Sequence, residues 1–299
     1  MSFAAESHVL VYGIAEPLGS LYVPKMVAYG TPIVAGVSPG YGGQVVAGIP
    51  VFDLVEQAIE TVGSIDTVLI LVPPYEVLDA ALEAMAAEIG QLILIAEGVP
   101  PLDMVQILRE AEATETLVVG PNSPGVIVPG EVLLGTHPAE CYLPGSVGLI
   151  SRSGTLTYEV ALELTRAGIG QSIAVGLGGD RIVGSSFQQW LQILEEDDRT
   201  EAIVLIGEIG GESEEMAARY IAEAIDKPVI AYLAGYSLPK GQPMGHVGAV
   251  VTAKIAGLGV DVGTIDSKLT AFKQAKIPVA DRPSKLPKLV QQALDKVRT

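Results

Sequence analysis

The run His8-Val9-Leu10-Val11-Tyr12-Gly13 decides the fold, because its uninterrupted apolar residues end in a glycine. Such a run is typical of a strand that is buried on both faces of a parallel sheet. Helical spacing follows from residue 19 to residue 30, with Pro24 inside it, and Pro32-Ile33-Val34-Ala35-Gly36-Val37 predicts a second buried strand. Strand, turn, helix and strand together make one βαβ unit.

The same alternation continues through the first half of the chain. It predicts helices at 53–62, 75–89 and 102–112 and strands at 67–72, 91–96 and 116–120. Apolar strands that alternate with amphipathic helices indicate a parallel sheet covered on both faces, so we expect residues 1–125 to form a Rossmann-like domain. Such sheets bind ligands beyond the carboxyl ends of their strands, which here are the loops 13–19, 37–43, 72–75 and 96–101.

The first of these loops, Gly13-Ile14-Ala15-Glu16-Pro17-Leu18-Gly19, argues against an ordinary NAD site. A dinucleotide fingerprint is G-x-G-x-x-G, but Ala15 replaces the middle glycine and Glu16 adds a negative charge. The second strand ends in Val37-Ser38-Pro39, without the acidic residue that binds a ribose hydroxyl. The glycine-rich loop Ser38-Pro39-Gly40-Tyr41-Gly42-Gly43 either wraps a ligand or forms a tight turn.

Between the two halves, Gly120-Pro121-Asn122-Ser123-Pro124-Gly125 combines turn-forming residues and predicts a rigid bend. Residues 126–144 contain scattered Pro and Gly without a clear period, so we expect them to be a connector. A second series of buried strands then begins, and residues 145–299 are expected to form a second domain.

In this second half, the strand Val147-Gly148-Leu149-Ile150-Ser151 leads into Ser153, Gly154 and Thr155 and then into a helix that reaches residue 167. Ser153 or Thr155 can cap the helix, and Gly154 leaves its first N–H groups accessible. Free N–H donors and the positive end of the helix dipole converge in such a turn, as they do in anion-binding sites. The alternative is an ordinary capped turn between a strand and a helix.

Further strand and helix pairs follow to the end of the chain. Strands are predicted from Ser172 toward Asp180, at 202–207 and at 228–234, and helices at 186–196, 214–225, 267–275 and 285–297. Residues 151–153, residues 178–180, Glu208 and His246 all come after strand ends. In a parallel sheet they are therefore expected at one edge.

His246 lies in the glycine-flanked stretch Pro243-Met244-Gly245-His246-Val247-Gly248-Ala249. With little side-chain bulk beside it, its imidazole is a candidate nucleophile that can meet a reacting group closely. The alternative is a structural histidine in a glycine-rich turn. Glu208 is suited to hold one imidazole nitrogen and leave the other free, or else it is a solvated glutamate at a helix start.

The composition restricts the partners and the compartment. With a net charge of −17, the chain is unsuited to nucleic acid or an anionic membrane, and any phosphate site must be built from N–H groups and a few cations. Cys141 is the single cysteine, so a reducing cytoplasm is the expected setting. We expect no signal peptide, no membrane span and, since no histidine pair or carboxylate ligand spacing is present, no metal site.

The chain resembles the α subunits of succinyl-CoA synthetase (succinate–CoA ligase). The stretches that carry this resemblance, in the family's order, are Gly120-Pro-Asn-Ser-Pro-Gly-Val-Ile127, Ser151-Arg-Ser-Gly-Thr-Leu-Thr-Tyr-Glu159, Gly178-Gly-Asp180, Thr200-Glu-Ala-Ile-Val-Leu-Ile-Gly-Glu-Ile-Gly-Gly211 and Met244-Gly-His-Val-Gly-Ala249. The resemblance covers the chain from its first strand to about residue 250 and implies a CoA-binding N-terminal domain and a flavodoxin-like ligase domain.

The resemblance also implies a reaction and residue roles. Acyl-CoA and inorganic phosphate give an acyl phosphate and free CoA, and the phosphoryl group then passes to a histidine and on to a nucleoside diphosphate. His246 matches that histidine, Glu208 matches the glutamate that steadies it, Ser153 and Gly154 match the phosphate cradle, and Tyr158 matches a substrate contact. The implied CoA contacts are Ala15, Glu16, Pro17, Leu18, Ser38, Tyr41, Ile95, Ala96 and Glu97. The nucleotide site, for ATP/ADP or GTP/GDP with Mg²⁺, belongs to the family's β subunit, in agreement with the lack of a Walker-type loop in this sequence.

The sequence departs from the family mainly in the CoA loops. Ala15 and Glu16 stand where the family usually has Thr and Gly, and Tyr41 stands where it usually has a lysine. Losing a cation and gaining a carboxylate weakens attraction to a CoA phosphate, whereas Tyr41 can stack on the adenine. Ser123 replaces the usual cysteine, and the lysine-bearing pattern after Ala249 is poorly kept.

We therefore expect the α subunit of an ADP- or GDP-forming succinate–CoA ligase that acts with a β subunit. One alternative is a ligase for citrate or another carboxylate. Another is a non-catalytic binding or regulatory homologue whose altered first loop no longer holds CoA. A nicotinamide dehydrogenase is the third, and it would need the fingerprint that Ala15 and Glu16 interrupt.

Overall fold

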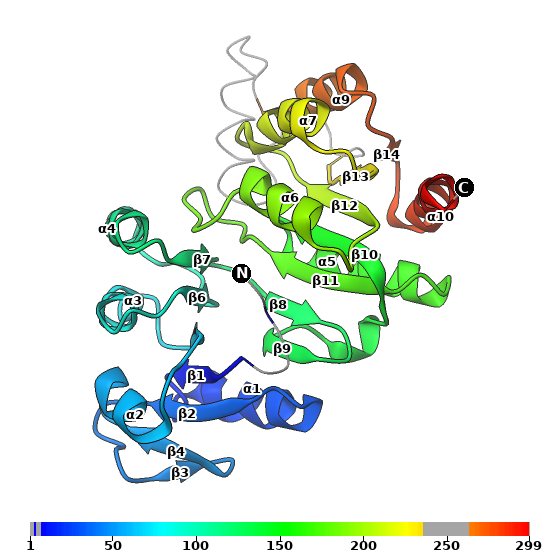
Figure 1. The fold of residues 1–299 in the computed structure, drawn as a ribbon. Helices are drawn as coiled ribbons and strands as arrows, with labels where there is room; N and C mark the ends of the chain where they lie inside the picture. Colours follow the sequence, from blue (N-terminus) through cyan, green and yellow to red (C-terminus); the bar gives the residue numbers. More distant parts are fainter. Residues whose placement is uncertain (1–2, 4–6, 236–262, 299) are drawn as a thin grey trace. The chain divides into compact units, whose positions relative to one another are not determined.

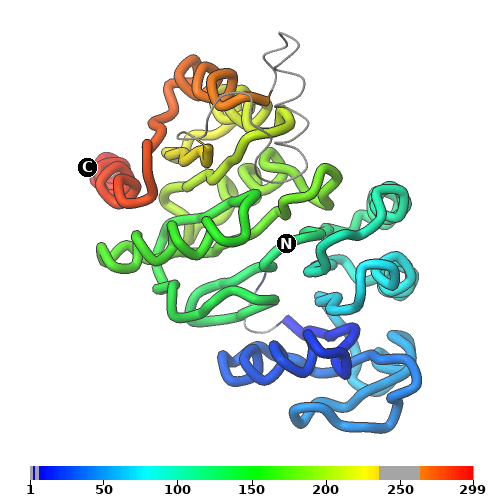
Figure 2. Tube along the Cα trace, turned by 180° about the vertical axis from the view of Figure 1, so that it is seen from behind, coloured from blue at the N-terminus to red at the C-terminus, as the bar shows by residue number. Residues whose placement is uncertain are grey.

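A computed structural model describes residues 3, 7–235 and 263–298, which form two compact units (Figures 1 and 2). The first unit comprises Met1–Ala139 together with Ile182–Ser185, and the second comprises Glu140–Arg181 and Ser186–Thr299. Within the described ranges, no helix is both long enough and apolar enough to cross a membrane.

The first unit is built on a parallel sheet. Its elements are β1 (Val9–Tyr12), α1 (Pro17–Tyr29), β2 (Ile33–Val37), β3 (Val45–Val46), β4 (Ile49–Phe52), α2 (Val55–Val62), β5 (Thr67–Ile70), α3 (Val77–Ala86), β6 (Gln91–Leu94), α4 (Pro101–Ala113) and β7 (Leu117–Val119). The strand order is β3-β4-β2-β1-β5-β6-β7, and only β3 is antiparallel to its neighbour. The order reverses at β1, which lies between β2 and β5.

Both faces of this sheet are buried. Leu10 and Ile70 belong to a cluster of buried residues that includes side chains of α2, α3 and α4, whereas Val9 and Leu69, one residue earlier on the same strands, are equally buried outside that cluster. Because successive side chains of a strand point to opposite faces, the sheet is covered on both sides. The Rossmann-like prediction is confirmed.

Residues 126–144, expected to be a connector, contain regular structure. β8 (Gly125–Val128) and β9 (Val132–Gly135) form an antiparallel hairpin around Pro129-Gly130, and the 3-10 helix η1 spans Ala139–Cys141. Thr31, after α1, donates its hydroxyl to the Leu133 carbonyl at 2.8 Å and accepts from the Leu133 N–H at 3.0 Å. The hairpin is thereby fixed to the end of α1.

The second unit contains a second parallel sheet. Its elements are β10 (Pro144–Ser151), α5 (Gly154–Arg166), β11 (Gln171–Gly176), α6 (Phe187–Glu196), β12 (Ala202–Gly207), α7 (Ser213–Ala224), β13 (Val229–Leu233), α9 (Ile265–Gln274), β14 (Val279–Ala280), the 3-10 helix η2 (Pro283–Lys285) and α10 (Leu286–Val297). These strands lie in the order β11-β10-β12-β13-β14, all parallel. This is the flavodoxin-like 2-1-3-4-5 order, and it confirms the fold predicted for the second half.

The helices of the second unit fall into two groups. α6, α7 and α9 contact one another in series, while α10 contacts α5. α6 begins with a capping box in which Ser186 and Gln189 satisfy each other's backbone N–H groups, and it buries Phe187 and Trp190 completely. The sheet order reverses at β10, so a ligand site is expected where the loops after β10 and β12 meet.

Candidate active site

The loops after β10 and β12 lie side by side at the carboxyl edge of the second sheet. The two strands are paired in parallel, with Ser151 opposite Ile206, so the residues that follow them are neighbours. The backbone N–H of Arg152 donates to the Ile206 carbonyl at 3.1 Å. The structure therefore brings the predicted phosphate-binding turn at Ser153 and the predicted orienting residue Glu208 to one place.

The turn at Ser153 begins a well-formed helix. Ser153 is the N-cap of α5, and its hydroxyl accepts a hydrogen bond from the N–H of Leu156 at 3.5 Å. Ser151 fixes the turn, because its hydroxyl accepts from the Ser153 N–H at 3.1 Å and donates to the Ser153 carbonyl at 2.9 Å. A helix leaves its first N–H groups without intrahelical partners, so the turn suits an anion as well as a simple cap.

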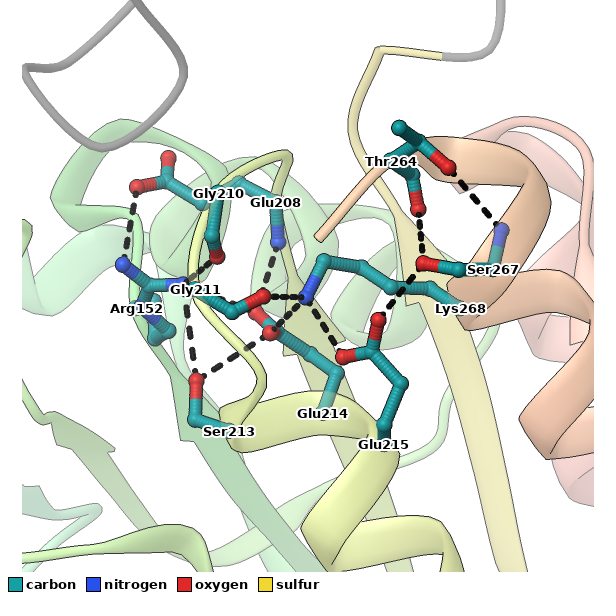
Figure 3. A network of polar contacts seen from close by, with 10 residues as sticks. All are labelled: Arg152, Glu208, Gly210, Gly211, Ser213, Glu214, Glu215, Thr264, Ser267 and Lys268. Carbon is teal, nitrogen blue, oxygen red and sulfur yellow. Dashed lines mark hydrogen bonds and ion pairs between the residues drawn. The ribbon is translucent and has the colours of Figure 1, made fainter. Parts of the chain in front are cut away.

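Glu208 is the first residue after β12, and a network of charged groups surrounds it (Figure 3). Its carboxylate forms an ion pair with the guanidinium of Arg152 at 3.8 Å, and only 13% of its side chain is exposed. Its backbone N–H donates to the carboxylate of Glu214 at 3.1 Å. Both the side chain and the backbone of Glu208 are thus held by residues from other elements.

Glu214 and Lys268 form a completely buried ion pair beside Glu208. The ammonium of Lys268 lies 2.5 Å from one carboxylate oxygen of Glu214, and both side chains are 0% exposed. Burial would raise the pKa of Glu214, but the charges of Lys268 and Arg152 outweigh it and hold this pKa below its usual value. Glu214 is therefore ionised at neutral pH.

Two other predicted residues of this site have different outcomes. Tyr158 lies on α5 and is half-buried, about one turn after Gly154. His246 lies outside the described residues, so its proximity to Glu208 stays a prediction. Nothing in the sequence pattern singled out Glu214 or Lys268, because an acid in the first turn of a helix and a lysine on an amphipathic helix are both typical of exposed surfaces.

In the first unit, a pocket of about 320 Å³ lies at the reversal point of the sheet. Its lining residues come from the start of α1 and from the loops after β1, β5 and β6, and they are Glu16, Pro17, Leu18, Leu71, Val72, Pro73, Pro74, Ala96 and Glu97. Five of the predicted CoA contacts, which are Glu16, Pro17, Leu18, Ala96 and Glu97, are therefore brought together. The walls are mainly apolar, and the two ionisable side chains among the lining residues are both carboxylates.

The remaining predicted CoA contacts do not line this pocket. Ser38 is buried and accepts a hydrogen bond from the N–H of Ala15 at 3.1 Å, so it joins the first loop to the second. Ile95 is half-buried after β6, and Tyr41 is 45% exposed on the glycine-rich loop. The role of each residue in CoA binding remains a prediction.

Asp53, a half-buried residue after β4, binds the glycine-rich loop, which the sequence pattern did not indicate. One of its carboxylate oxygens accepts from the N–H of Gly40 at 2.7 Å and from the N–H of Gly42 at 3.0 Å. The N–H groups of Tyr41 and Gly43 donate to backbone carbonyls. The loop therefore presents the Tyr41 side chain rather than backbone donors to a ligand.

Charge in the first unit is strongly negative. Between positions 1 and 139 the sequence has one lysine, Lys25, and one arginine, Arg109, and Lys25 lies over the ring of Tyr22 on the same helix. Glu16, at the N-cap of α1, places a carboxylate at the positive end of that helix. In the described part of the chain, no group of three or more His, Cys, Asp or Glu residues is placed to hold a metal ion.

Comparisons with known proteins match the two halves of the chain to two different families. The CoA binding domain family matches residues 4–98, and the CoA-ligase family matches residues 150–277. The chain is 42% identical over 286 residues to the ADP-forming succinate–CoA ligase subunit alpha 2 of Archaeoglobus fulgidus, covering 96% of each chain. It is 42% identical over 291 residues to the corresponding alpha subunit of Aquifex aeolicus, covering 97% of this chain and 93% of that one.

Solved structures show the same fold in larger proteins. ATP citrate lyase from Methanothrix soehngenii matches with a TM-score of 0.87 at 24% identity, and the match covers 100% of this chain and 51% of that one. This chain thus spans about half the length of that enzyme, and the likeness shows the fold alone. Taken with the curated relatives and the two family matches, the sheet orders and the sites identify the chain as a member of the succinate–CoA ligase α-subunit family.

Proposed function

We propose that this chain is the α subunit of a succinate–CoA ligase, ADP- or GDP-forming, that acts in the cytoplasm with a β subunit. The observation that carries the proposal is the meeting of the α5 N-terminus at Ser153 with the Glu208 loop at the point where the second sheet reverses. Membership of the succinate–CoA ligase α-subunit family suggests the reaction, and this arrangement suits its phosphate-binding and phosphoryl-transfer steps. We further propose residues 1–125 as the CoA-binding domain and residues 145–299 as the ligase domain.

In the proposed reaction, the first step exchanges CoA for phosphate. Inorganic phosphate attacks the thioester of succinyl-CoA, the carbon–sulfur bond breaks, and succinyl phosphate and CoA are formed. The α5 N-terminus at Ser153 and Gly154 suits the phosphate, because its N–H groups and dipole offset negative charge without a cation. Tyr158, on the same helix, is proposed to contact the acid.

The second step passes the phosphoryl group through a histidine. The imidazole of His246 attacks the phosphorus of the acyl phosphate, succinate leaves, and the phosphohistidine then donates the group to ADP or GDP with Mg²⁺ on the β subunit. Glu208 is proposed to accept a hydrogen bond from one imidazole N–H, which leaves the other nitrogen free as the nucleophile. Glu208 is suited to this role because its carboxylate pairs with Arg152 and its side chain is largely buried.

The first experiment measures phosphate incorporation into the chain. The chain, paired with its co-expressed β subunit, is incubated with radiolabelled ATP or GTP beside the His246→Ala variant. We expect acid-labile, base-stable label on the wild type and none on the folded variant. Label retained by His246→Ala would remove His246 from the mechanism, and an unlabelled wild type in a properly paired complex would overturn the proposed ligase.

The charge of the first unit favours one second candidate, a non-catalytic homologue with impaired CoA binding. Glu16 and Glu97 line the pocket, and Asp53 occupies loop N–H groups. Calorimetry with CoA separates the candidates. Binding in the paired complex supports the ligase, whereas no binding at millimolar CoA supports the homologue.

A further inference from the structure

Three charged side chains from three different elements hold the loop that carries Glu208 (Figure 3). Arg152 follows β10, Glu214 lies in the first turn of α7, and Lys268 lies on α9. All three are buried, with Glu214 and Lys268 at 0% exposure. Burying charged groups costs free energy, and a buried ion pair often adds little net stability. We therefore consider a functional role for these three residues beside the Glu208 loop.

Glu214 contacts both the backbone and the ion-pair partner of Glu208. One of its carboxylate oxygens accepts from the N–H of Glu208 at 3.1 Å and from the guanidinium of Arg152 at 3.2 Å. The other oxygen accepts from Lys268 at 2.5 Å and from the hydroxyl of Ser213 at 3.1 Å. The carboxylate of Glu214 thus binds both the backbone N–H of Glu208 and Arg152, the cation that pairs with the Glu208 side chain.

The two cations bind the rest of the loop through its carbonyl groups. Arg152 donates to the carbonyl of Gly210 at 2.8 Å, and Lys268 donates to that of Gly211 at 2.9 Å. Both residues have positive φ, 107° for Gly210 and 64° for Gly211, a conformation that glycine adopts readily. Neither has a side chain that could pack against the protein. Hydrogen bonds to buried charges therefore hold the backbone of the loop at Gly210 and Gly211.

Lys268 also affects the ion pair between Arg152 and Glu208, because it shares the partner Glu214 with Arg152. Lys268 contacts Glu214 at 2.5 Å and Glu215 at 2.8 Å, and so it offsets carboxylate charge on α7. Arg152 can then lie between Glu214, at 3.2 Å, and Glu208, at 3.8 Å. Without Lys268, the uncompensated charge of Glu214 would draw Arg152 away from Glu208.

We propose that Glu214, with Lys268 as its counter-ion, is a positioning residue that orients Glu208 for phosphoryl transfer to and from His246. The inference rests on the proposed function. It adds two residues that do not themselves touch a substrate, and it predicts that their effect on the reaction passes through Glu208. A displacement of about 1 Å at a reacting group can slow a reaction by roughly a hundredfold, so the orientation of Glu208 has a measurable consequence.

A double-mutant cycle tests this dependence. The rate of phosphohistidine formation from labelled nucleotide is measured in the paired complex for wild type, Glu214→Gln, Glu208→Gln and the double variant. We expect Glu214→Gln to slow labelling by about tenfold or more, with an unchanged KM for the nucleotide, and to have no further effect in the Glu208→Gln background. Equal losses in both backgrounds would show a merely structural role and overturn the inference.

Two further variants keep the test decisive. Glu223→Gln, on an exposed position of the same helix, is the matched control and should label at the wild-type rate. Ser213→Ala removes the hydroxyl that donates to Glu214 at 3.1 Å and accepts from Arg152 at 3.5 Å, and it serves if Glu214→Gln does not fold. We expect a two- to threefold slower rate that is absent in the Glu208→Gln background, roughly the effect of one lost hydrogen bond. A wild-type rate for Ser213→Ala in that case would overturn the inference. In this labelling experiment an unlabelled wild type would instead overturn the proposed function, so the two failures are distinguishable.

Discussion

Replacing Lys268 by Met is expected to destabilise the second unit strongly. The substitution keeps an unbranched chain of similar length but removes the cation from a pair in which both side chains are 0% exposed. Glu214 would keep only Arg152 and Ser213 as side-chain partners in a buried position. Breaking one partner of a buried ion pair costs about 3–5 kcal/mol of unfolding free energy. For a domain of this size, the melting temperature should fall by about 6–20 °C.

The loss should depend on pH. In the wild type the pKa of Glu214 is lowered, so its contribution to stability is present above about pH 4.5 and is lost as the pH falls through the lowered pKa. In Lys268→Met, burial acts against a weaker opposing charge and raises this pKa, so the carboxyl takes up a proton in mild acid. The difference between wild type and variant should therefore shrink between pH 7 and about pH 4.

Thermal or denaturant unfolding of both proteins at several pH values checks this prediction. Lys273→Met is the matched control, because Lys273 is exposed on the same helix, and it should change stability by less than about 0.5 kcal/mol. A Lys268→Met effect below about 1 kcal/mol at pH 7, or one that stays constant down to pH 4, would refute the reasoning.

Two other predictions concern the first unit. Tyr41→Lys should bind CoA about fivefold more tightly than wild type, because it adds a cation at an exposed position of the glycine-rich loop, and pantetheine, which lacks the phosphates, should show no gain. Calorimetry beside the neutral variant Tyr41→Gln measures this, and equal CoA affinities would show that the loop does not contact a phosphate. Burial lowers the pKa of His137 from 6.5 to about 4, so the neutral form is favoured and the stability it contributes is complete above about pH 6.5. That stability, about 3 kcal/mol, should be lost as the pH falls toward 4, and unfolding of His137→Leu should lack this dependence; a variant with the wild-type pH dependence would contradict it.

Most of the regular structure was predictable from the sequence, because parallel strands buried on both faces leave long apolar runs. The strand predicted at residues 8–13 is β1, and the helix predicted at 186–196 is α6, with Ser186 as its cap. The short strands β3 and β4 were missed, since all their residues except Val51 are exposed or half-buried and β4 contains Pro50. The hairpin β8–β9 was also missed, although Pro129-Gly130 between two apolar runs is a turn signal.

The sequence by itself determined the two sheets, the family, and the fact that Ser153 and Glu208 follow strand ends, because these depend on periodicity and on motifs along the chain. Only the tertiary structure decided which charges lie next to Glu208. Arg152 and Glu214 are 62 residues apart in sequence, and Glu214 and Lys268 are 54 residues apart. No local sequence pattern relates residues at such separations. Likewise, Asp53 accepts hydrogen bonds from the N–H groups of Gly40 and Gly42, which precede it by 13 and 11 residues, because the chain turns back at β3 and β4. A periodic pattern records which face of an element is buried, whereas a contact between elements is fixed only when the sheets and helices pack.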